Sequence, residues 1–555
     1  MKRLFISALA IGMACLTASP CTNIIVGKKA STDGSVICTY SCDGYGGYSG
    51  LDITPAADYK PGTMMALRMW GRPGAVPDSI PQVAHTFNVV NNMNEFQLTI
   101  TETTFDGRTE LRNPDGLINY PQLMQLGLQR AKTAREAITV MADLMDKYGY
   151  SSEGETFSVC DPNEAWIMEI IGKGKGGKGA IWVAIRIPDD CVSAHANQSR
   201  IDKIPFDDKE NCMYAKDVVS FAREKGYYKG SDKDFSFCDA YCPLDFSGRR
   251  FCEARVWSFF TKWCDPAMNE YLPFILGTSD KKMPLYIKPT KKLSVQDIQN
   301  AMRDHYEGTP LDETNDYSWG PYASPNRPSP LTYEVNGKKY FQERPIGTVQ
   351  SMFTLVAQMR SFLPNEIGGV LWFGNDDSNM VAYVPIYCGS TRTPECFDDS
   401  MANGQTFSFK SAFWMQNWVA NMIYPRYNLM IGDLREAQSE LENQFHNDQS
   451  VVEALAKAKY DGGDKEGTVK MLNDYSIRAS QQMMDRWMQL AQLLIVKYND
   501  FKVRPSENGK VVRGRSTDYP ISQEFLEQMV KVSGDRYLVP EEKHDKDSLH
   551  NDVLR

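Results

Sequence analysis

The sequence has few histidines and no apolar stretch long enough to cross a lipid bilayer. Only six of its 555 residues are His, and they are scattered, which disfavours a zinc site. The apolar run Leu4–Leu16 is shorter than the roughly 20 residues that a membrane-spanning helix needs. A polytopic membrane protein is therefore excluded.

The chain also lacks an excess of basic residues and the common cofactor motifs. Its 61 Lys and Arg against 70 Asp and Glu give a net charge of −9, so it is not a dedicated nucleic-acid-binding protein, which needs clustered Lys and Arg. We find no internal repeat, no GxGxxG, no Walker A loop, no HExxH and no GxSxG motif. We therefore expect no cofactor and no metal.

What is present is the composition of an ordinary soluble globular protein. Hydrophobic residues make up 42% of the chain and charged residues 24%. The 25 Phe, 27 Tyr and 10 Trp supply enough apolar surface for a core, which excludes wholesale disorder. The length suggests three or four domains at roughly 150 residues each, or one elaborated fold with extensions.

The first twenty residues have the order of a secretory signal peptide. Met1-Lys2-Arg3 is a short positive start, the apolar run follows, and Thr17-Ala18-Ser19-Pro20 comes next. We therefore expect export to the periplasm or the extracellular space. A buried N-terminal helix and a lipoprotein anchor are the alternatives. Loss of Lys2 and Arg3 with this segment takes the net charge from −9 to −11.

Removing the signal peptide takes Cys15 away and leaves twelve of the thirteen cysteines. Exported proteins form disulfides, so some pairing is plausible. The pairs Cys38/Cys42 and Cys238/Cys242 have C-x3-C spacing, whereas a zinc site favours C-x2-C pairs or nearby His.

Strand-like runs fall into two groups separated by two helices. The mature start predicts a hairpin of strands 23–28 and 35–41 around Asp33-Gly34. Leucines from 117 to 128 predict one helix, and the capping box Thr133–Glu136 opens a second that ends at Gly149. Further strands or buried elements are predicted at 64–69, 85–90, 96–101, 156–160, 165–170, 181–187, 191–195, 349–359, 370–373 and 381–387.

This order favours an α+β protein with helices layered on stacked antiparallel sheets. The stretch 411–499 reads as helical, with the charged run Asp433–Asn443 as a solvated face. We expect four segments: signal peptide 1–20, catalytic domain 21–400, helical C-terminal region 401–540 and polar tail 541–555.

Cys21 stands just after the signal peptide and just before a predicted strand. Once it is the first residue, its own α-amine can act as base for its thiol, because a model α-amine titrates at about 8 and a free thiol at about 8.5. Such a site needs no His. The alternative is a disulfide-bonded or buried structural Cys.

Several short motifs accompany Cys21 along the chain. They are the stretch 21–35, Thr101-Glu102-Thr103-Thr104-Phe105, Tyr148-Gly149-Tyr150, Asp161-Pro162-Asn163-Glu164-Ala165-Trp166, His195-Ala196-Asn197-Gln198-Ser199-Arg200-Ile201, 302–310 and 368–374. Together, over roughly residues 21–390, they resemble the family C69 dipeptidases, which are N-terminal nucleophile hydrolases related to penicillin V acylase and conjugated bile acid hydrolase. The resemblance implies a four-layer αββα fold, here with a helical C-terminal extension, and Cys21 as the nucleophile.

The resemblance also implies roles for residues far apart in the sequence. Asp43 matches the Asp that holds the terminal amine, with an ordinary turn Asp as the alternative. Asn197 matches an oxyanion donor, and the alternative is a turn Asn that caps backbone. Arg255 matches an Arg near the nucleophile, where it can depress the thiol pKa; the alternative is a surface or salt-bridging Arg.

Three further positions are weaker. Thr104 is our choice for a second oxyanion donor in the substrate site. Arg200 is either a substrate contact or a salt-bridge residue. Tyr40 departs from the family pattern, because many relatives have an Arg there, and this leaves one charge-stabilising role unfilled or moved.

We expect an exported cysteine dipeptidase that cleaves short peptides through an acyl-enzyme on Cys21 and matures by self-cleavage before it. The expected partner is the peptide substrate, with no nucleic acid and no integral membrane segment; a homo-oligomer is left open. The alternatives are an acylase or amidase acting on a non-peptide amide, such as a bile acid conjugate, and an inactive surface protein on the same fold.

Overall fold

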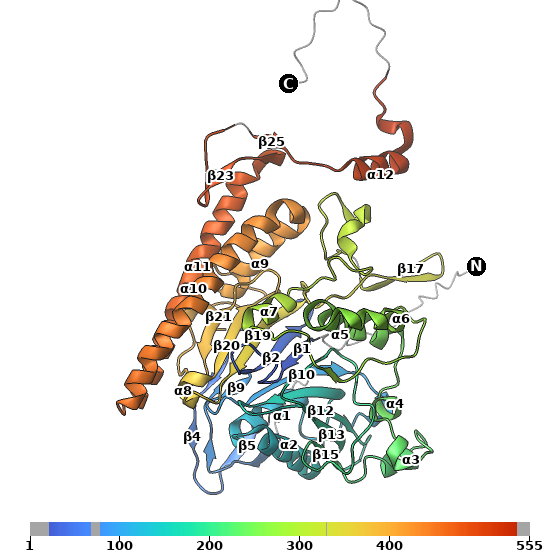
Figure 1. Ribbon diagram of the computed structural model, residues 1–555, viewed down its shortest axis with the longest axis vertical. Coiled ribbons are helices and arrows are strands. Elements are labelled where there is room, and N and C mark those ends of the chain that lie inside the picture. The colour runs from blue at the N-terminus through green and yellow to red at the C-terminus, as the bar shows by residue number, and fades with distance from the viewer. Residues whose placement is uncertain (1–20, 68–77, 329, 515, 541–555) are drawn as a thin grey trace, which may run out of the picture.

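The computed structural model describes residues 21–67, 78–328, 330–514 and 516–540. The predicted signal peptide 1–20 and tail 541–555 lie outside the described residues, as do the last two residues of the predicted strand 64–69. The described chain is α+β, as predicted. Two large antiparallel sheets carry helices on their outer faces (Figure 1).

The strand that follows Cys21 lies inside a seven-stranded sheet. β1 (Asn23–Val26) pairs with β2 (Val36–Asp43) on one side and with β14 (Val192–His195) on the other. The predicted hairpin is confirmed, and Gly34 supplies its turn with a φ of 81°. The sheet order is β16-β14-β1-β2-β19-β20-β21, the remaining strands being β16 (Tyr286–Ile287), β19 (Ser351–Met359), β20 (Val370–Asn375) and β21 (Val384–Tyr387).

An eight-stranded sheet packs against the first one, and β10 approaches β1 and β2 most closely. Its strands alternate between residues facing the other sheet and residues facing helices, which accounts for two separate hydrophobic clusters. In the order β15-β13-β12-β11-β10-β9-β8-β3, the strands are β15 (Cys212–Tyr214), β13 (Ala180–Ile187), β12 (Ala165–Gly172), β11 (Gly154–Cys160), β10 (Thr99–Phe105), β9 (Met93–Asn94), β8 (Val89–Val90) and β3 (Ile53–Thr54).

Two predicted strands have different bounds in the structure. The run 85–90 is split into β7 (His85–Thr86) and β8, because Phe87 donates its N–H to the Gln129 carbonyl and Asn88 donates its own to Glu95. The predicted strand 96–101 starts later, at Thr99, since Gln97 is in a left-handed turn with a φ of 67°. The strand then continues to Phe105.

Helices α1 (Tyr120–Arg130) and α2 (Ala134–Tyr148) cover the eight-stranded sheet, as Figure 1 shows. Both were predicted from their apolar spacing. The Thr133 hydroxyl caps α2 by accepting the Glu136 N–H, and the helix ends where Gly149 takes a φ of 75°. Such an N-cap is worth about 1 kcal/mol.

The opposite sheet is covered by α9 (Ala412–Ile423), α10 (Tyr427–Asp461) and α11 (Lys465–Lys497), which contact β20 and β21. The predicted helical region is confirmed, but the solvated face at Asp433–Asn443 is partly wrong. Glu442 forms a buried ion pair with Arg303, and Asp433 pairs with Lys497 at 2.7 Å. Because α10 lies on the sheet, these charges face partners from other elements rather than solvent.

The remaining elements surround this core. Arg255 lies on α5 (Ala254–Phe259), which is flanked by π-helical turns at 248–253 and 260–264, and the hairpin β17–β18 projects beyond it. The other bounds are α3 (Ser220–Glu224), α4 (Phe237–Tyr241), α6 (Leu272–Ile275), α7 (Val295–Ala301), α8 (Asn365–Gly368), α12 (Gln523–Ser533), β4 (Ala57–Asp58), β5 (Met64–Ala66), β6 (Ser79–Pro81), β17 (Thr332–Val335), β18 (Lys338–Phe341), β22 (Lys502–Val503), β23 (Ser506–Glu507), β24 (Lys510–Val511) and β25 (Thr517–Asp518).

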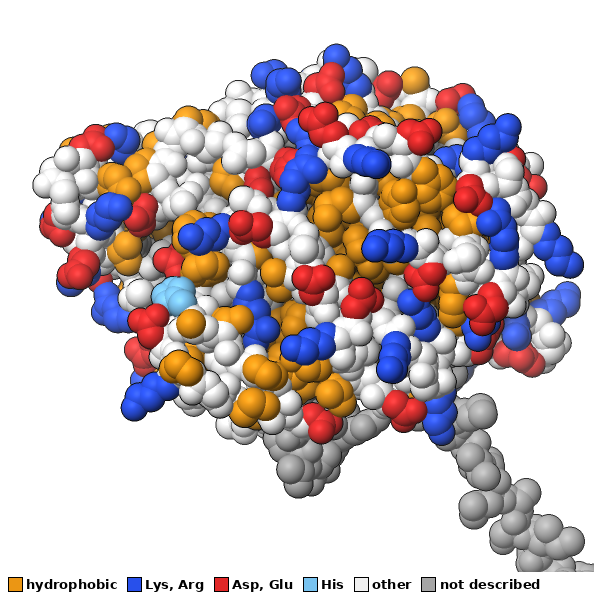
Figure 2. All heavy atoms as spheres, turned by 90° about the horizontal axis from the view of Figure 1, so that it is seen from below, with side chains coloured by type: hydrophobic (Ala, Val, Ile, Leu, Met, Phe, Trp, Pro, Cys, Tyr) orange, Lys and Arg blue, Asp and Glu red, His pale blue; other side chains and the backbone are white. Residues whose placement is uncertain are grey.

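The next features are the surface of the protein, the lengths of its helices and the state of its cysteines. On the face seen from below, acidic and basic side chains are interspersed with apolar ones between them (Figure 2). In the described ranges, no helix has the length and apolar character required to span a membrane. No disulfide joins any two of the twelve cysteines in those ranges.

Candidate active site

Cys21 lies two residues before β1, in the space between the two sheets. Its side chain is only 1% exposed, and its Sγ lies 3.7 Å from Oε1 of Glu102 on β10. A hydrogen bond with Cys42, burial and the negative charge of Glu102 all raise the pKa of the Cys21 thiol well above its ordinary value. A reaction that uses this thiol as a nucleophile therefore needs a base.

Arg255 connects Cys21 with Asn197. Its Nη1 donates to the Cys21 carbonyl oxygen at 2.6 Å and to the Thr22 hydroxyl at 2.7 Å, while Nη2 donates to Asn197 Oδ1 at 3.0 Å. The guanidinium is buried between these groups. Its planar fork fixes the backbone of Cys21 and the orientation of the Asn197 amide at the same time.

Asn197 follows β14 and has a φ of 54°, a left-handed conformation that Asn adopts more readily than most residues. Its Nδ2 donates to the Thr104 carbonyl oxygen at 2.6 Å. A side-chain amide carries two N–H groups, so a role as oxyanion donor depends on the second one. The structure thus brings Cys21, Asn197, Arg255 and Thr104 together.

Asp43 ends β2 and is fully buried. Its carboxylate accepts a hydrogen bond from the Ser351 hydroxyl at 2.6 Å and forms an ion pair with Arg344. Burial raises the pKa of Asp43, and the Arg344 charge opposes that shift. Arg344 was not identified from the sequence, because 301 positions separate it from Asp43 and it lies in an irregular segment.

A pair of buried carboxyl groups lies beside the thiol and was also missed. Tyr40, which departs from the expected pattern, donates its hydroxyl to Glu102 Oε1 at 2.5 Å. The Thr104 hydroxyl contacts Glu155 at 3.0 Å and Glu102 at 3.4 Å. Burial raises the pKa of both glutamates. The sequence placed Thr104 after the predicted strand 96–101, whereas it lies within β10, and nothing indicated that Glu155 would lie opposite.

A cavity of about 1170 Å³ opens onto this arrangement. Of the predicted site residues, Thr104, Asn197 and Arg255 line it, together with Arg344 and Asp106. A further group of side chains comes from the segments that follow α5: Glu313, Asn326, Arg327, Leu331, Glu343 and Gln350. This volume accommodates a small ligand with room for its side chains.

Arg200 does not line this cavity. It is buried, its Nε donates to Glu253 at 2.7 Å, and its Nη1 donates to the Ala194 carbonyl at 2.9 Å. The substrate contact considered for Arg200 is therefore wrong, and its salt-bridge alternative holds. A buried guanidinium requires such partners because an unpaired charge is strongly disfavoured away from water.

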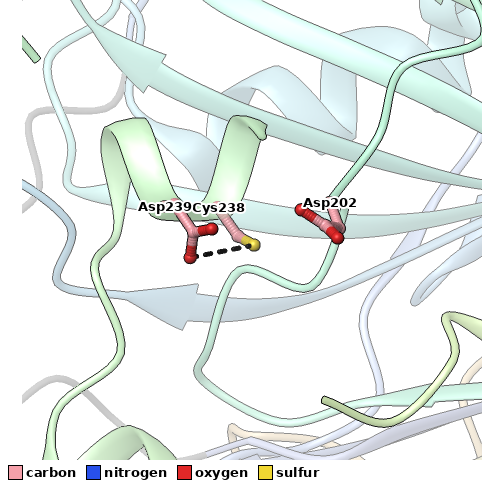
Figure 3. Close-up of side chains that lie close together, drawn as sticks. All are labelled: Asp202, Cys238 and Asp239. Atoms are coloured by element: carbon pink, nitrogen blue, oxygen red, sulfur yellow. Dashed lines mark hydrogen bonds between the residues drawn. The ribbon is translucent and has the colours of Figure 1, made fainter. Parts of the chain in front are cut away.

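In the part of the chain that the structure describes, one group of side chains has ligand atoms close enough together to hold a metal ion: Asp202, Cys238 and Asp239 (Figure 3). The Lys282 ammonium already contacts it, at 2.5 Å from Asp239, 3.6 Å from the Cys238 sulfur and 3.9 Å from Asp202. Because this cation balances the negative charge, we assign no metal to the cluster.

Comparison with known proteins decides the family. The model of peptidase family C69 matches residues 75–440. The chain belongs to this family. Similar proteins include a probable dipeptidase of Salmonella dublin, 27% identical over 406 residues that cover 70% of this chain and 85% of that protein. Dipeptidase A of Lactobacillus helveticus is 26% identical over 487 residues, covering 84% of this chain and 93% of its own.

Membership identifies this C69 peptidase as a peptide-bond hydrolase, which confirms the predicted enzyme class. The segment matched by the family model contains Thr104, Asn197, Arg200 and Arg255. Cys21 and Asp43 precede it. Their roles in the C69 peptidase therefore rest on their geometry and on the resemblance of the mature start.

Proposed function

We propose that this C69 peptidase is an exported dipeptidase whose nucleophile is the thiol of Cys21, exposed as the first residue of the mature chain. The observation that carries the proposal is the set of hydrogen bonds from Arg255, which tie the Cys21 carbonyl to Asn197 at the cavity wall. The two outer helical layers and two inner sheets suit the αββα fold of the N-terminal nucleophile hydrolases. The relatives named dipeptidases support the substrate class.

The reaction begins with transfer of the thiol proton to the α-amine of Cys21. The thiolate attacks the scissile carbonyl carbon, an S–C bond forms, and the carbonyl electrons move onto oxygen. The Asn197 amide donates to this oxyanion; a donor of this kind contributes about 2.7–4 kcal/mol. The α-ammonium then protonates the leaving amine as the C–N bond breaks, and water releases the acyl group from sulfur.

The surrounding charges fit this use of an α-amine. Asp43 and Arg344 form a neutralised pair at the end of β2, beside the strand that follows Cys21. Asp43 can therefore hold the amine while Arg344 prevents an excess of negative charge. The raised pKa of the Cys21 thiol makes the base necessary.

The amine exists only after cleavage before Cys21, since an amide nitrogen is not a base at neutral pH. We propose that signal peptidase cuts after Ala18 and that the thiol of Cys21 then cleaves the Pro20–Cys21 bond. Export to the periplasm or extracellular space rests on the charge and apolar pattern of the first twenty residues.

Hydrolysis of a dipeptide by the Cys21→Ser variant tests the proposal. We expect at least about a 1,000-fold loss of kcat/KM, because removal of a nucleophile eliminates the covalent route. Cys396→Ser is the matched control: Cys396 is a half-buried free thiol that does not line the cavity. Wild-type turnover by Cys21→Ser, or no dipeptide hydrolysis by the mature wild-type enzyme, contradicts the proposal.

A further inference from the structure

Two buried carboxyl groups lie side by side next to the candidate nucleophile. Glu102 on β10 and Glu155 on the neighbouring β11 have 1% and 0% of their surface exposed. The Thr104 hydroxyl contacts both, and Thr104 itself lines the cavity. Figure 1 shows β10 next to β1 and β2, the strands that present Cys21 and Tyr40.

No cation in the described ranges balances these carboxyl groups. Neither glutamate forms an ion pair with Lys or Arg there; the two carboxyl groups lie close enough to hydrogen-bond to each other, and Oε2 of Glu155 is buried with no other side chain bonded to it. Some other buried acids of the described ranges are paired with a cation, as Glu442 is with Arg303 and Glu453 with Arg360, whereas Glu169 and Asp376 form no ion pair. Buried carboxylates are normally paired because desolvation is costly. A site of this kind is complementary to a cation brought by a ligand.

The distance to the thiol fits one particular cation. In a dipeptide, the nitrogen of the free α-ammonium lies about 2.5 Å from the scissile carbonyl carbon, by standard bond lengths and angles. That carbon approaches an attacking atom to about 3–3.5 Å. Glu102 Oε1 lies 3.7 Å from the Cys21 sulfur. These distances allow a carbonyl positioned for attack to place its α-ammonium within hydrogen-bond reach of Glu102.

Glu102 and Glu155 contact the lining residue Thr104 but do not themselves line the cavity, and the acids that do line it fit this role less well. Glu313 is paired with Arg327, and Glu343 with Arg250. Asp106 lines the cavity, but it follows Glu102 by four residues, which is about 13 Å along an extended strand. It is too far along the strand to reach an amine one carbon away from the reacting carbonyl.

We propose that the Glu102–Glu155 pair binds the free α-ammonium group of the substrate, so that the enzyme acts on peptides with an unblocked amino terminus. This inference rests on the proposed function, in which Cys21 attacks a dipeptide. Thr104 holds the two carboxyl groups together, and Tyr40 orients Glu102 from the opposite side. The cleavage before Cys21 also vacates the space that any residue bonded to the Cys21 nitrogen must occupy.

The test compares three substrates on the mature wild-type enzyme: alanyl-alanine, N-acetyl-alanyl-alanine and lactoyl-alanine, in which a hydroxyl replaces the amino group. We expect kcat/KM to be at least about 100-fold higher for alanyl-alanine, because a site built for a polar group rejects analogues that lack it. Equal hydrolysis of all three overturns the inference. This comparison uses only the wild-type enzyme, so its result does not depend on whether a variant folds correctly.

The variants Glu102→Gln and Glu155→Gln locate the preference. We expect them to lower kcat/KM for alanyl-alanine strongly and for lactoyl-alanine by less than about threefold, so that the ratio falls at least tenfold. Asp106→Asn is the control: it removes a carboxylate from the same cavity and keeps the wild-type ratio. A ratio that persists in both Gln variants, or collapses in Asp106→Asn, overturns the inference.

The result also separates this inference from the proposed function. If hydrolysis depends on Cys21 but proceeds equally with the three substrates, the proposed function is supported and the ammonium subsite is contradicted. An equal loss on free and blocked substrates in Glu102→Gln means that the carboxyl pair serves the α-amine of Cys21 instead, which overturns the subsite. Absence of all dipeptide hydrolysis contradicts the proposed function itself.

Discussion

His195 is a buried histidine whose neighbours hold it neutral. Its Nδ1 lies 2.7 Å from the Thr103 hydroxyl, its Nε2 lies 2.8 Å from the Ser158 hydroxyl, and it pairs with Asn23 across the sheet. Burial, with smaller contributions from Arg200 and Arg255, lowers the pKa of His195 to about 3. This side chain therefore packs the two sheets together two residues before Asn197, without taking part in acid–base chemistry at neutral pH.

The shift makes stability depend on pH in a defined direction. Between pH 6.5, where an unfolded His titrates, and about 3, the unfolded chain binds one proton more than the folded chain at this position. The free energy of unfolding is therefore unaffected above pH 6.5 and falls as the pH decreases, by at most about 1.4 kcal/mol per pH unit.

The substitution His195→Gln keeps a polar group between the two hydroxyls and removes this titration. We expect urea unfolding between pH 6.5 and 4 to show a shallower loss of stability than the wild type, by up to one proton in slope. His85→Gln is the control, because His85 lies on the surface and contacts Asp58. An unchanged slope in His195→Gln contradicts the neutral, buried state of His195.

At the scale of elements, a buried charge joins α10 to the segment after α7 and to the residue that precedes β21. Glu442 pairs with Arg303 and also accepts the backbone N–H of Tyr383 at 2.9 Å. Two residues away, Glu440 is exposed and pairs with Arg486 at the surface. The same helix thus carries both buried and exposed ion pairs.

Removal of each acid should separate the two kinds of pair. Glu442→Ala leaves Arg303 buried without its partner, so we expect the free energy of unfolding to fall by about 3–5 kcal/mol. Glu440→Ala should change it by less than about 1 kcal/mol, since exposed pairs contribute little. Chemical denaturation measures both, and similar losses in the two variants argue against α10 as an integral layer.

Elements whose signals are local were predictable from the sequence. The β1–β2 hairpin follows from a Gly at the turn, and α2 from its cap and apolar spacing. The start of β10 could not be predicted from the sequence, because it depends on the left-handed turn at Gln97. The buried face of α10 could not be predicted either, since the ion-pair partner of Glu442 is 139 residues away in the sequence.

Some residues of the candidate site were identified from the sequence, and others were not. Cys21, Asn197 and Arg255 came from a pattern of short motifs, and they meet in space. Arg344, Glu102 and Glu155 were missed because charged residues carry no periodic signal and their contacts depend on tertiary packing. Arg200 lies within one of these motifs, but its buried ion pair with Glu253 gives it a structural role and not a role in the site.

At the scale of the whole molecule, the proposed function requires an ordered maturation. Cleavage after Ala18 leaves Ser19-Pro20 in front of Cys21, whose nitrogen is then an amide and not a base at neutral pH. We expect a precursor that starts at Ser19 and has no activity, and a mature enzyme that starts at Cys21.

Mass spectrometry of the exported protein checks this expectation. Cys21→Ala should accumulate with Ser19 or an earlier residue at its amino terminus, because it lacks the thiol that cleaves the Pro20–Cys21 bond. Cys396→Ala should be processed as the wild type is. Fully active wild-type protein that retains Ser19-Pro20 would show that neither the maturation step nor the α-amine mechanism operates.

The position of β1 inside its sheet has a further consequence for the mature amino terminus. The first residues of a chain usually fluctuate, and ordering them is entropically unfavourable. Here β1 is hydrogen-bonded to β2 and β14 on its two sides, and Thr22 bridges to Ser41. The conformational entropy of the reacting terminus is therefore lost once, when the chain folds, and not again at each turnover.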